Sequence, residues 1–279
     1  MGKIFQGNND IIKCQKMKSN KQKFALVTGA AGLLGREHAI ALLEEDFNCI
    51  LTDINYQKLK NIKKKLPKKF QDKTIIKKMD VSNDKSVKEI YNFIKIRKLY
   101  LNVLINNAAI DAKVSTIKNN ANNLENLNLN LFINELSVGL IGAVITTKYF
   151  GKLISKNING GSIINIGSDL SVIAPNHSIY QGGYKKPVSY SIIKHGLLGL
   201  TRYISTYWPK QKVRCNMISP GPVLQNQPKA LIKNLKQNIP MGRLASKSEY
   251  KGIIKFLSSE YSSYITGQNI IIDGGKTVW

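Results

Sequence analysis

The chain has 279 residues, of which 43% are hydrophobic and 21% charged, and its formal net charge is +25 at pH 7. This composition is that of an ordinary globular protein and excludes a fully disordered or fibrous chain. No run of eighteen or more apolar residues predicts a transmembrane helix, and the polar first twenty residues lack the apolar segment of a secretory signal. We therefore expect a cytoplasmic protein that does not use a membrane as a partner.

The positive charge does not predict a nucleic-acid partner. Only five of the 42 basic residues are arginine, and the lysines are scattered, most densely over residues 58–78. Base and phosphate recognition favour arginine, and the sequence shows no basic motif interleaved with aromatic residues. A solvated basic surface that attracts anionic small molecules is the better interpretation.

The cysteines and histidines predict neither disulfides nor a metal site. Cys14, Cys49 and Cys215 are far apart and form no Cys-x-x-Cys pair, which fits a reducing compartment. The three histidines show no ligand spacing with carboxylates or cysteines. We therefore expect no metal.

Short apolar segments alternate with amphipathic ones along most of the chain. They predict buried strands at residues 24–27, 49–51, 74–76, 101–105, 161–166, 213–218 and 269–272. The apolar spacing between them predicts helices at residues 33–45, 56–66, 82–97, 132–154, 190–207, 231–237 and 247–257. Residues 112–130 are rich in asparagine and predict a long loop. Strands that are apolar throughout and alternate with helices predict an α/β fold, a doubly wound parallel sheet with helices on both faces.

A glycine-rich turn stands between the first predicted strand and the first predicted helix. Gly29, Gly32 and Gly35 follow Thr28 there. Glycines at such a place allow a tight turn and a close approach to a pyrophosphate, which the N–H groups of the helix N-terminus then bind. This context makes a purely structural turn the weaker alternative. We expect Gly29, Gly32, Leu34 and Gly35 to contact a dinucleotide cofactor.

The sequence predicts one domain. Residues 1–20 lack apolar periodicity, and we expect them to form a flexible basic tail. No linker, repeat or break in composition divides residues 21–279. We therefore expect a single Rossmann-type domain that binds NAD(P) and carries the substrate loops within it.

The position of Asp53 favours NAD(H) over NADP(H) as the cofactor. The residue ends the second predicted strand, eighteen residues after Gly35. A carboxylate there accepts hydrogen bonds from the adenosine ribose and repels a 2′-phosphate. The alternative role is to cap the helix that starts near Tyr56. Lys58 and Arg36 lie close enough in sequence to leave NADP(H) open.

Tyr190 and Lys194 are four residues apart on a predicted helix, so both side chains lie on one face. A phenol with its ordinary pKa of about 10 is a weak acid–base catalyst at neutral pH. A neighbouring ammonium group favours the phenolate and moves its pKa toward the working range. The pair therefore predicts acid–base chemistry rather than an ordinary surface contact.

With these motifs the chain resembles the short-chain dehydrogenases/reductases, from about Lys23 to Gly275. The resemblance is carried by the glycine turn and by several further motifs. These are Asp80-Val81, Asn106-Asn107-Ala108, Asn165-Ile166-Gly167-Ser168, Tyr190 with Lys194, and Pro220-Gly221. The resemblance implies an oxidoreductase that interconverts a secondary alcohol and a ketone with a nicotinamide cofactor.

The resemblance also implies a role for each residue. Ser168 would position the substrate oxygen, Tyr190 would be the general acid and base, and Lys194 would hold the nicotinamide ribose and tune Tyr190. The other implied cofactor contacts are Asp80 and Val81 at the adenine, Asn107 and Ala108 at the centre, and Pro220, Gly221 and Val223 at the nicotinamide. Family members pair through their long helices, which implies a homodimer or homotetramer.

The chain departs from the family pattern at several places. Gly32 precedes the usual position of the second glycine, and Ala109 stands where the family has glycine. Gly139 takes the place of a fourth catalytic residue, an asparagine that anchors a water of the proton relay. The relay must therefore be rebuilt, or turnover is low. Tyr190 follows Ser168 by 22 residues, farther than is usual, and the extra stretch borders the expected substrate site.

The extra stretch, residues 175–183, together with residues 107–111 and 225–228, resembles a subgroup associated with bacterial surface-sugar and flagellin-glycan modification. This resemblance implies a polar or sugar-like small-molecule substrate. His177 within the extra stretch is expected to be a loop residue rather than a substrate contact. Two alternatives stay open. One is a 3-oxoacyl-thioester (acyl-carrier-protein) reductase. Asp53 disfavours this alternative, because that reaction commonly uses NADPH whereas Asp53 favours NAD(H). The other is a cofactor-binding protein with weak catalysis, which Gly139 would explain.

Overall fold

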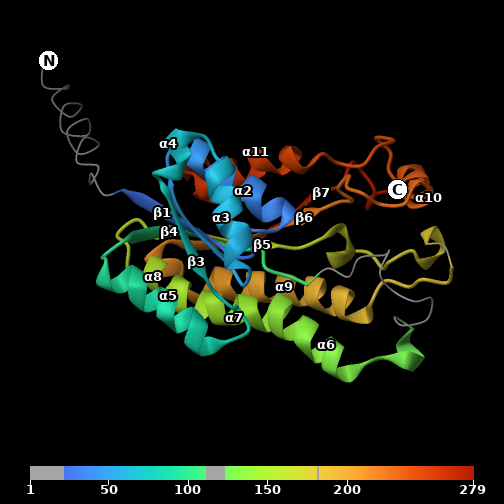
Figure 1. Cartoon of the computed structure of the whole chain (residues 1–279), viewed down its shortest axis with the longest axis horizontal. Helices are drawn as coiled ribbons and strands as arrows, with labels where there is room; N and C mark the ends of the chain where they lie inside the picture. Colours follow the sequence, from blue (N-terminus) through green and yellow to red (C-terminus); the bar gives the residue numbers. More distant parts are fainter. Residues whose placement is uncertain (1–21, 111–122, 181) are drawn as a thin grey trace, which may run out of the picture.

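The computed structural model describes residues 22–110, 123–180 and 182–279, which fold around one parallel sheet of seven strands (Figure 1). The strand order is β3-β2-β1-β4-β5-β6-β7. The strands are β1 Lys23–Val27, β2 Asn48–Asp53, β3 Thr74–Lys78, β4 Tyr100–Asn106, β5 Gly161–Ile166, β6 Val213–Pro220 and β7 Asn269–Ile272. The winding reverses between β1 and β4. At such a reversal, α/β folds bind ligands in a crevice outside the carboxyl ends of the strands.

Helices cover both faces of the sheet (Figure 1). The helices are α2 Leu33–Glu44, α3 Tyr56–Lys65, α4 Lys68–Gln71, α5 Asp84–Ile96, α6 Leu129–Leu136, α7 Gly142–Thr146, α8 Lys152–Ile154, α9 Val188–Tyr207, α10 Lys229–Gln237 and α11 Lys251–Ser258. Each face has its own apolar core, because the strands are apolar on both sides. Val27 and Leu51 pack in the core that α2 and α11 cover, whereas Leu26 and Leu104 pack in the core that α5 and α9 cover.

The predicted α/β fold with a doubly wound parallel sheet is confirmed. Each predicted strand is present, and 161–166 and 269–272 are correct to the residue. Of the predicted loop at residues 112–130, residues 112–122 lie outside the described residues. Its predicted end is wrong, because α6 begins at Leu129. Asn128 caps this helix, since its side chain accepts a hydrogen bond from the backbone N–H of Leu131. The predicted tail at residues 1–20 lies outside the described residues.

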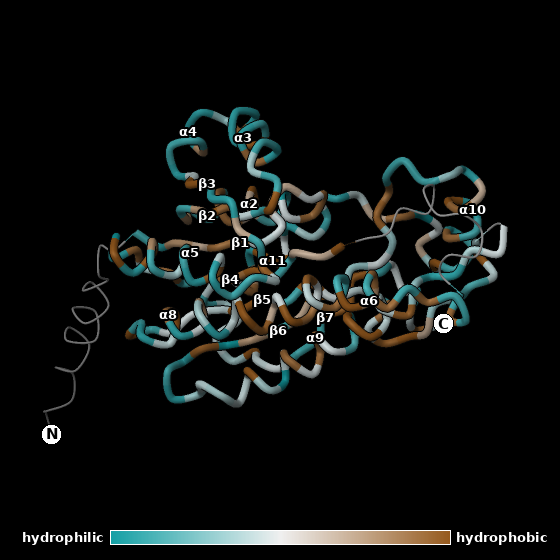
Figure 2. The backbone as a smooth tube through the Cα atoms, turned by 60° about the horizontal axis from the view of Figure 1, so that its bottom comes forward, coloured by the Kyte–Doolittle hydropathy of each residue, from teal (hydrophilic) through white to brown (hydrophobic). Residues whose placement is uncertain are grey.

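Helical residues run without a break from Leu129 to Ile154, through α6, α7, α8 and two π-helical turns. By length and composition alone this segment is able to cross a membrane. Its contacts place it instead in a layer of the fold, because Phe150 and Ile154 are buried in the core against the sheet. Its outer side exposes Ile133 and Val144. Figure 2 shows the contrast with α3 and α4, which are hydrophilic along most of their length.

A small separate apolar cluster lies beyond the carboxyl ends of the strands. Leu231 and Leu235 of α10 pack there with Ile179, which belongs to the extra stretch between Ser168 and Tyr190. The side-chain amide of Asn234 also donates a hydrogen bond to the carbonyl oxygen of Ile179 at 2.8 Å. The extra stretch is therefore attached to α10 at the end of the sheet that carries the crevice.

Candidate active site

The glycine turn is packed too tightly for side chains. Gly29 has a φ of +59°, and a Cβ there would lie 2.7 Å from the Cα of Ala108. A Cβ on Gly35 would lie 2.4 Å from the carbonyl oxygen of Gly29. Both positions therefore require glycine. Within the described part of the chain, α2 starts after Gly32 without a side-chain cap, so no capping side chain occupies its first N–H groups.

Asn107 and Thr28 fasten this turn to β4. The side-chain amide of Asn107 donates to the carbonyl oxygens of Thr28 and Gly29, each at 3.0 Å. The hydroxyl oxygen of Thr28 accepts from the backbone N–H groups of Asn107 and Ala108. The structure thus places Asn107 and Ala108 beside Gly29 in the crevice.

Asp53 stands at the end of β2 and contacts the same turn. Its Oδ2 accepts from the N–H of Ala31 at 3.0 Å, and its Oδ1 accepts from the N–H of Asn55 at 2.9 Å. The alternative role of Asp53 as the cap of α3 is wrong, because Asn55 is that cap and accepts from the N–H of Lys58. Each carboxylate oxygen accepts more than one hydrogen bond. Asp53 can therefore hold the turn and still accept from ribose hydroxyls.

Asp80 and Val81 follow β3, the strand beside β2. Oδ1 of Asp80 accepts from the N–H of Ser82 at 2.9 Å and from its hydroxyl at 2.6 Å, so this carboxylate orders its own turn. Val81 is buried beneath Gly142, where a Cβ would lie 2.7 Å from Cγ2 of Val81. Both residues lie near Asp53, at the end of the crevice where the adenine is expected.

The loop after β6 is held in place by two contacts of its backbone. Pro220 ends the strand, and a Cβ on Gly221 would lie 2.6 Å from the Cα of Asp273, so this loop packs closely on the segment after β7. Val223 pairs with Ala245 in an isolated β-bridge. These contacts place the expected nicotinamide residues at the carboxyl end of β6, beside that of β5.

Ser168, Tyr190 and Lys194 come together at the end of β5. Lys194 is buried, and its ammonium group donates to the carbonyl oxygen of Ile166, the last residue of β5, at 2.8 Å. Its Nζ lies 5.6 Å from the ring centre of Tyr190. Ser168 follows β5 and starts the 3-10 turn Asp169–Ser171, which packs against α9, the helix of Tyr190 and Lys194. The structure therefore brings the three expected catalytic residues to one place.

The hydroxyl of Ser168 has a buried carboxylate as its neighbour. It donates to Oδ1 of Asp169 at 2.7 Å and accepts from the N–H of Leu170. Oδ2 of Asp169 is paired with the ammonium group of Lys276, and both side chains are nearly buried. The sequence does not predict this contact, because Lys276 follows β7, 107 residues after Asp169. Ser168 must turn its proton away from Asp169 before it can donate to a substrate oxygen.

The space beside Gly139 is filled. A Cβ on Gly139 would lie 2.8 Å from Cγ2 and 3.1 Å from Cδ1 of Ile193, a buried residue of α9. Gly139 belongs to the π-helical turn Ser137–Ile141, a feature that is frequent at functional sites. Ile193 thus occupies the place of the family's asparagine side chain, and a proton route past residue 139 would have to use the backbone.

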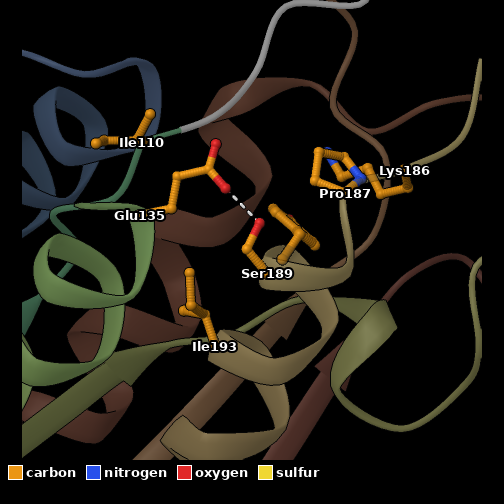
Figure 3. Close-up of a pocket in the computed structure, with 7 residues that line it drawn as sticks. Ile110, Glu135, Lys186, Pro187, Ser189 and Ile193 are labelled. Atoms are coloured by element: carbon orange, nitrogen blue, oxygen red, sulfur yellow. Dashed lines mark hydrogen bonds between the residues drawn. The ribbon is translucent and has the colours of Figure 1, made fainter. Parts of the chain in front are cut away.

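A small pocket lies beside Tyr190 (Figure 3). Its lining residues are Ile110, Glu135, Lys186, Pro187, Ser189, Tyr190 and Ile193. Glu135 is buried, and its Oε2 accepts a hydrogen bond from the hydroxyl of Ser189. Nζ of Lys186 lies 3.9 Å from the ring centre of Tyr190. Glu135 and Lys186 were not predicted from the sequence. The one feature that could have indicated Glu135 is a carboxylate within the apolar segment of α6, four residues before Gly139.

His177, Cys49 and Cys215 have structural roles. Nδ1 of His177 accepts from the backbone N–H of Lys186 at 3.3 Å, so His177 orders the extra stretch. Cys49 and Cys215 are buried and free, and burial raises the pKa of the Cys215 thiol to about 12. Such a thiol is a poor nucleophile and metal ligand. Among the described residues, no group of three His, Cys, Asp or Glu side chains is placed to hold a metal ion.

The crevice fits a nicotinamide dinucleotide. The start of α2 after Gly32 has no side-chain cap within the described residues, so its N–H groups can bind a pyrophosphate. Asp53 offers a carboxylate to the adenosine ribose at one end of the crevice. At the other end, the buried ammonium group of Lys194 lies near Tyr190, where the nicotinamide ribose would be held.

Comparison with known proteins agrees with this arrangement. Residues 29–277 match the family model described as enoyl-(acyl carrier protein) reductase. Trans-4-hydroxycyclohexanecarboxylate dehydrogenase of Sinomonas cyclohexanicum is 28% identical, over 92% of this chain and 93% of that protein. The 3-oxoacyl-[acyl-carrier-protein] reductase of Buchnera aphidicola is 30% identical, over 91% of this chain and 97% of that protein.

A solved structure gives the same relationship. The short chain dehydrogenase from Leptospira borgpetersenii with bound NAD+ has a TM-score of 0.79 and 27% identity, and the match covers 92% of this chain and 94% of that one. The predicted oxidoreductase activity and the nicotinamide cofactor are thereby confirmed. The chain belongs to the short-chain dehydrogenase/reductase family and is an NAD(P)-dependent oxidoreductase that acts on CH–OH groups.

Proposed function

We propose that the protein interconverts a secondary alcohol and a ketone on a polar or sugar-like substrate and prefers NAD(H). The observation that carries the proposal is the gathering of Ser168, Tyr190 and Lys194 at the end of β5. A carboxylate, Asp53, stands at the cofactor's opposite end. A relative named for trans-4-hydroxycyclohexanecarboxylate, a polar secondary alcohol, supports the substrate class.

Each residue at the reacting end has a separate task. The nicotinamide, when bound, supplies or accepts the hydride. Tyr190 exchanges a proton with the substrate oxygen, and Lys194 keeps a positive charge close to the phenol ring from its place on the Ile166 carbonyl. Ser168 binds the same substrate oxygen once its hydroxyl has turned from Asp169.

Cofactor titration and a substrate panel test the proposal. NADH and NADPH are titrated by fluorescence, and NAD+-dependent oxidation is then measured for polyols, hydroxy acids and simple secondary alcohols. We expect tighter binding of NADH and turnover of a polar secondary alcohol that Tyr190→Phe abolishes. Cofactor binding without turnover across the whole panel would instead support a cofactor-binding protein with weak catalysis.

A 3-oxoacyl-thioester reductase is the second candidate. The relative from Buchnera aphidicola carries that name, and a net charge of +25 would attract an acidic carrier protein. Asp53 disfavours this candidate, because a carboxylate at this position repels the 2′-phosphate of NADPH. Faster reduction of a 3-oxoacyl thioester with NADPH than of any ketone with NADH would favour this candidate.

We also propose a cytoplasmic homodimer or homotetramer of the surface-sugar and flagellin-glycan subgroup. The outer side of the α6–α8 segment exposes a group of large apolar side chains, which a second copy would cover. They are Leu129, Leu131, Ile133, Ile141 and Val144. The extra stretch between Ser168 and Tyr190, which packs on α10, is the basis for the subgroup.

A further inference from the structure

Glu135 brings a carboxylate close to the proposed proton-transfer group. It belongs to α6, and only 6% of the residue is exposed. Its Oε2 accepts a hydrogen bond from the hydroxyl of Ser189, which precedes Tyr190 in the first turn of α9. Figure 3 shows the carboxylate pointing from its helix toward Ser189 at the pocket. Glu135 and Tyr190 therefore line the same small space.

This carboxylate has accepting capacity that the protein does not use. Two carboxylate oxygens together offer about four acceptor positions. Ser189 is the one hydrogen-bond partner of Glu135 in the described part of the chain, and it occupies Oε2. Oε1 accepts no hydrogen bond from the described residues, and in Figure 3 it points away from Ser189. Oε1 is not one of the fully buried polar atoms without a partner in the described residues, so it is accessible to a group that enters the pocket.

The start of α9 explains why the charge is tolerated. Within the described residues, this helix has no side-chain cap and no acidic residue in its first turn. The partial positive charge of its N-terminus stabilises a nearby anion such as the Glu135 carboxylate. The N-terminus of α9 therefore stabilises Oε2, the oxygen that faces Ser189. It supplies no hydrogen-bond donor to Oε1.

We propose that Oε1 of Glu135 binds a second hydroxyl group of the substrate, so that polyols are preferred over simple secondary alcohols. This inference rests on the proposed function, since it places another part of the molecule that reacts at Tyr190. Glu135 and Tyr190 both line this pocket, so a molecule that binds at its mouth lies beside both side chains. Ile110, Pro187 and Ile193 give it apolar walls for the carbon skeleton.

The pocket also contains a cationic side chain, since Lys186 lines it with its Nζ 3.9 Å from the ring centre of Tyr190. A neutral hydroxyl can donate to Oε1 without adding a further charge there. An analogue without the hydroxyl would lose this hydrogen bond and place an apolar group against Oε1, which lowers its affinity.

The test compares cyclohexane-1,2-diol with cyclohexanol. For the wild type, Glu135→Leu and Glu135→Gln, it measures kcat and KM with NAD+ and the Kd of each compound for the enzyme–NAD+ complex. Glu125→Gln is the matched control, because Glu125 is exposed and the change removes the same charge. Melting temperature and NADH affinity show that each variant is folded.

We expect the wild type and Glu125→Gln to prefer the diol by about tenfold or more in kcat/KM. Glu135→Leu should reduce this preference to less than about threefold, chiefly through a higher KM for the diol, because no acceptor remains. Glu135→Gln should keep part of the preference, since its amide oxygen still accepts a hydrogen bond.

The inference is overturned by an unchanged diol preference in Glu135→Leu or by a wild type without preference. It is also overturned by a wild-type enzyme–NAD+ complex that binds neither compound. If Glu135 only anchors α9, Glu135→Leu lowers turnover of both compounds by the same factor, which also overturns it. Failure of the proposed function has a different signature, namely no NADH binding or no oxidation of any secondary alcohol.

Discussion

Replacing Gly139 with asparagine tests the departure from the family pattern. The new Cβ would lie 2.8 Å from Cγ2 and 3.1 Å from Cδ1 of Ile193, which is itself buried. Overpacking of this kind costs about 1–3 kcal/mol, while the gain in helix propensity over glycine is only about 0.3 kcal/mol. We therefore expect Gly139→Asn to be less stable by about 1–3 kcal/mol, at roughly 2–4 °C of melting temperature per kcal/mol.

Two matched variants separate this clash from a general effect of the substitution. In α9, a Cβ added to Gly199 meets no heavy atom of the described residues within 4 Å, so Gly199→Asn should leave the melting temperature unchanged or slightly higher. Ile193→Ala removes both contacting atoms. In the Ile193→Ala background, Gly139→Asn should lower the free energy of unfolding by a smaller amount. The coupling energy between the two substitutions, measured by calorimetry, should be about 1 kcal/mol or more. Additive losses across this double-mutant cycle would refute the steric argument.

The same variants show whether a proton relay has been lost. Because Ile193 fills the space that asparagine would need, Gly139→Asn alone should change kcat by less than about threefold, well below the ordinary contribution of an acid–base step. In the Ile193→Ala background the asparagine has room, and a rise of about tenfold or more over Ile193→Ala alone would indicate a lost relay. Steady-state NADH formation measures kcat of Gly139→Asn alone and in the Ile193→Ala background. A rise of that size in the single variant would contradict the interpretation that Ile193 blocks the place.

Further predictions concern the cofactor, the catalytic pair, the assembly and a buried histidine. NADH should bind more tightly than NADPH by about 1–3 kcal/mol, and Asp53→Ala should narrow the gap in fluorescence titrations. Equal affinities in the wild type would exclude this role of Asp53. Tyr190→Phe should lower kcat by about 10²–10⁴-fold with little change in NADH affinity, whereas Lys194→Ala should lower both. If Tyr190→Phe keeps full activity, the catalytic site is assigned wrongly. Light scattering should report a dimer or tetramer at micromolar concentration, and a monomer alone would contradict the proposed assembly. Burial lowers the pKa of His38 from 6.5 to about 3. Between these pH values the unfolded chain binds more protons than the folded one, so stability falls as the pH drops. His38→Leu should flatten this slope in denaturant titrations at several pH values, and an unchanged slope would show that other groups cause it.

The fold could be predicted because its signals are local. The turn from Gly29 to Gly35 lies between one strand and one helix, and Tyr190 and Lys194 share a single helix, so neighbouring residues carry the pattern. The predicted ends of the helices were less accurate, because capping residues determine where a helix begins. The helix predicted from residue 82 begins at Asp84, since Asn83 caps it and accepts from the N–H of Ser86. An asparagine can therefore end a loop as well as indicate one.

The parts of the site that the sequence does not predict are contacts between distant segments. Glu135 and Ser189 are 54 residues apart, and Asp169 and Lys276 are 107 residues apart. No local periodicity shows which faces of these segments meet, because the sheet topology decides it. Each such contact nevertheless changes how a motif residue works: Asp169 holds the proton of Ser168, and Glu135 adds an acceptor to the pocket. The motif residues determine the reaction, whereas the choice of substrate depends on these distant neighbours, which is why the motifs alone indicate the chemistry and not the substrate.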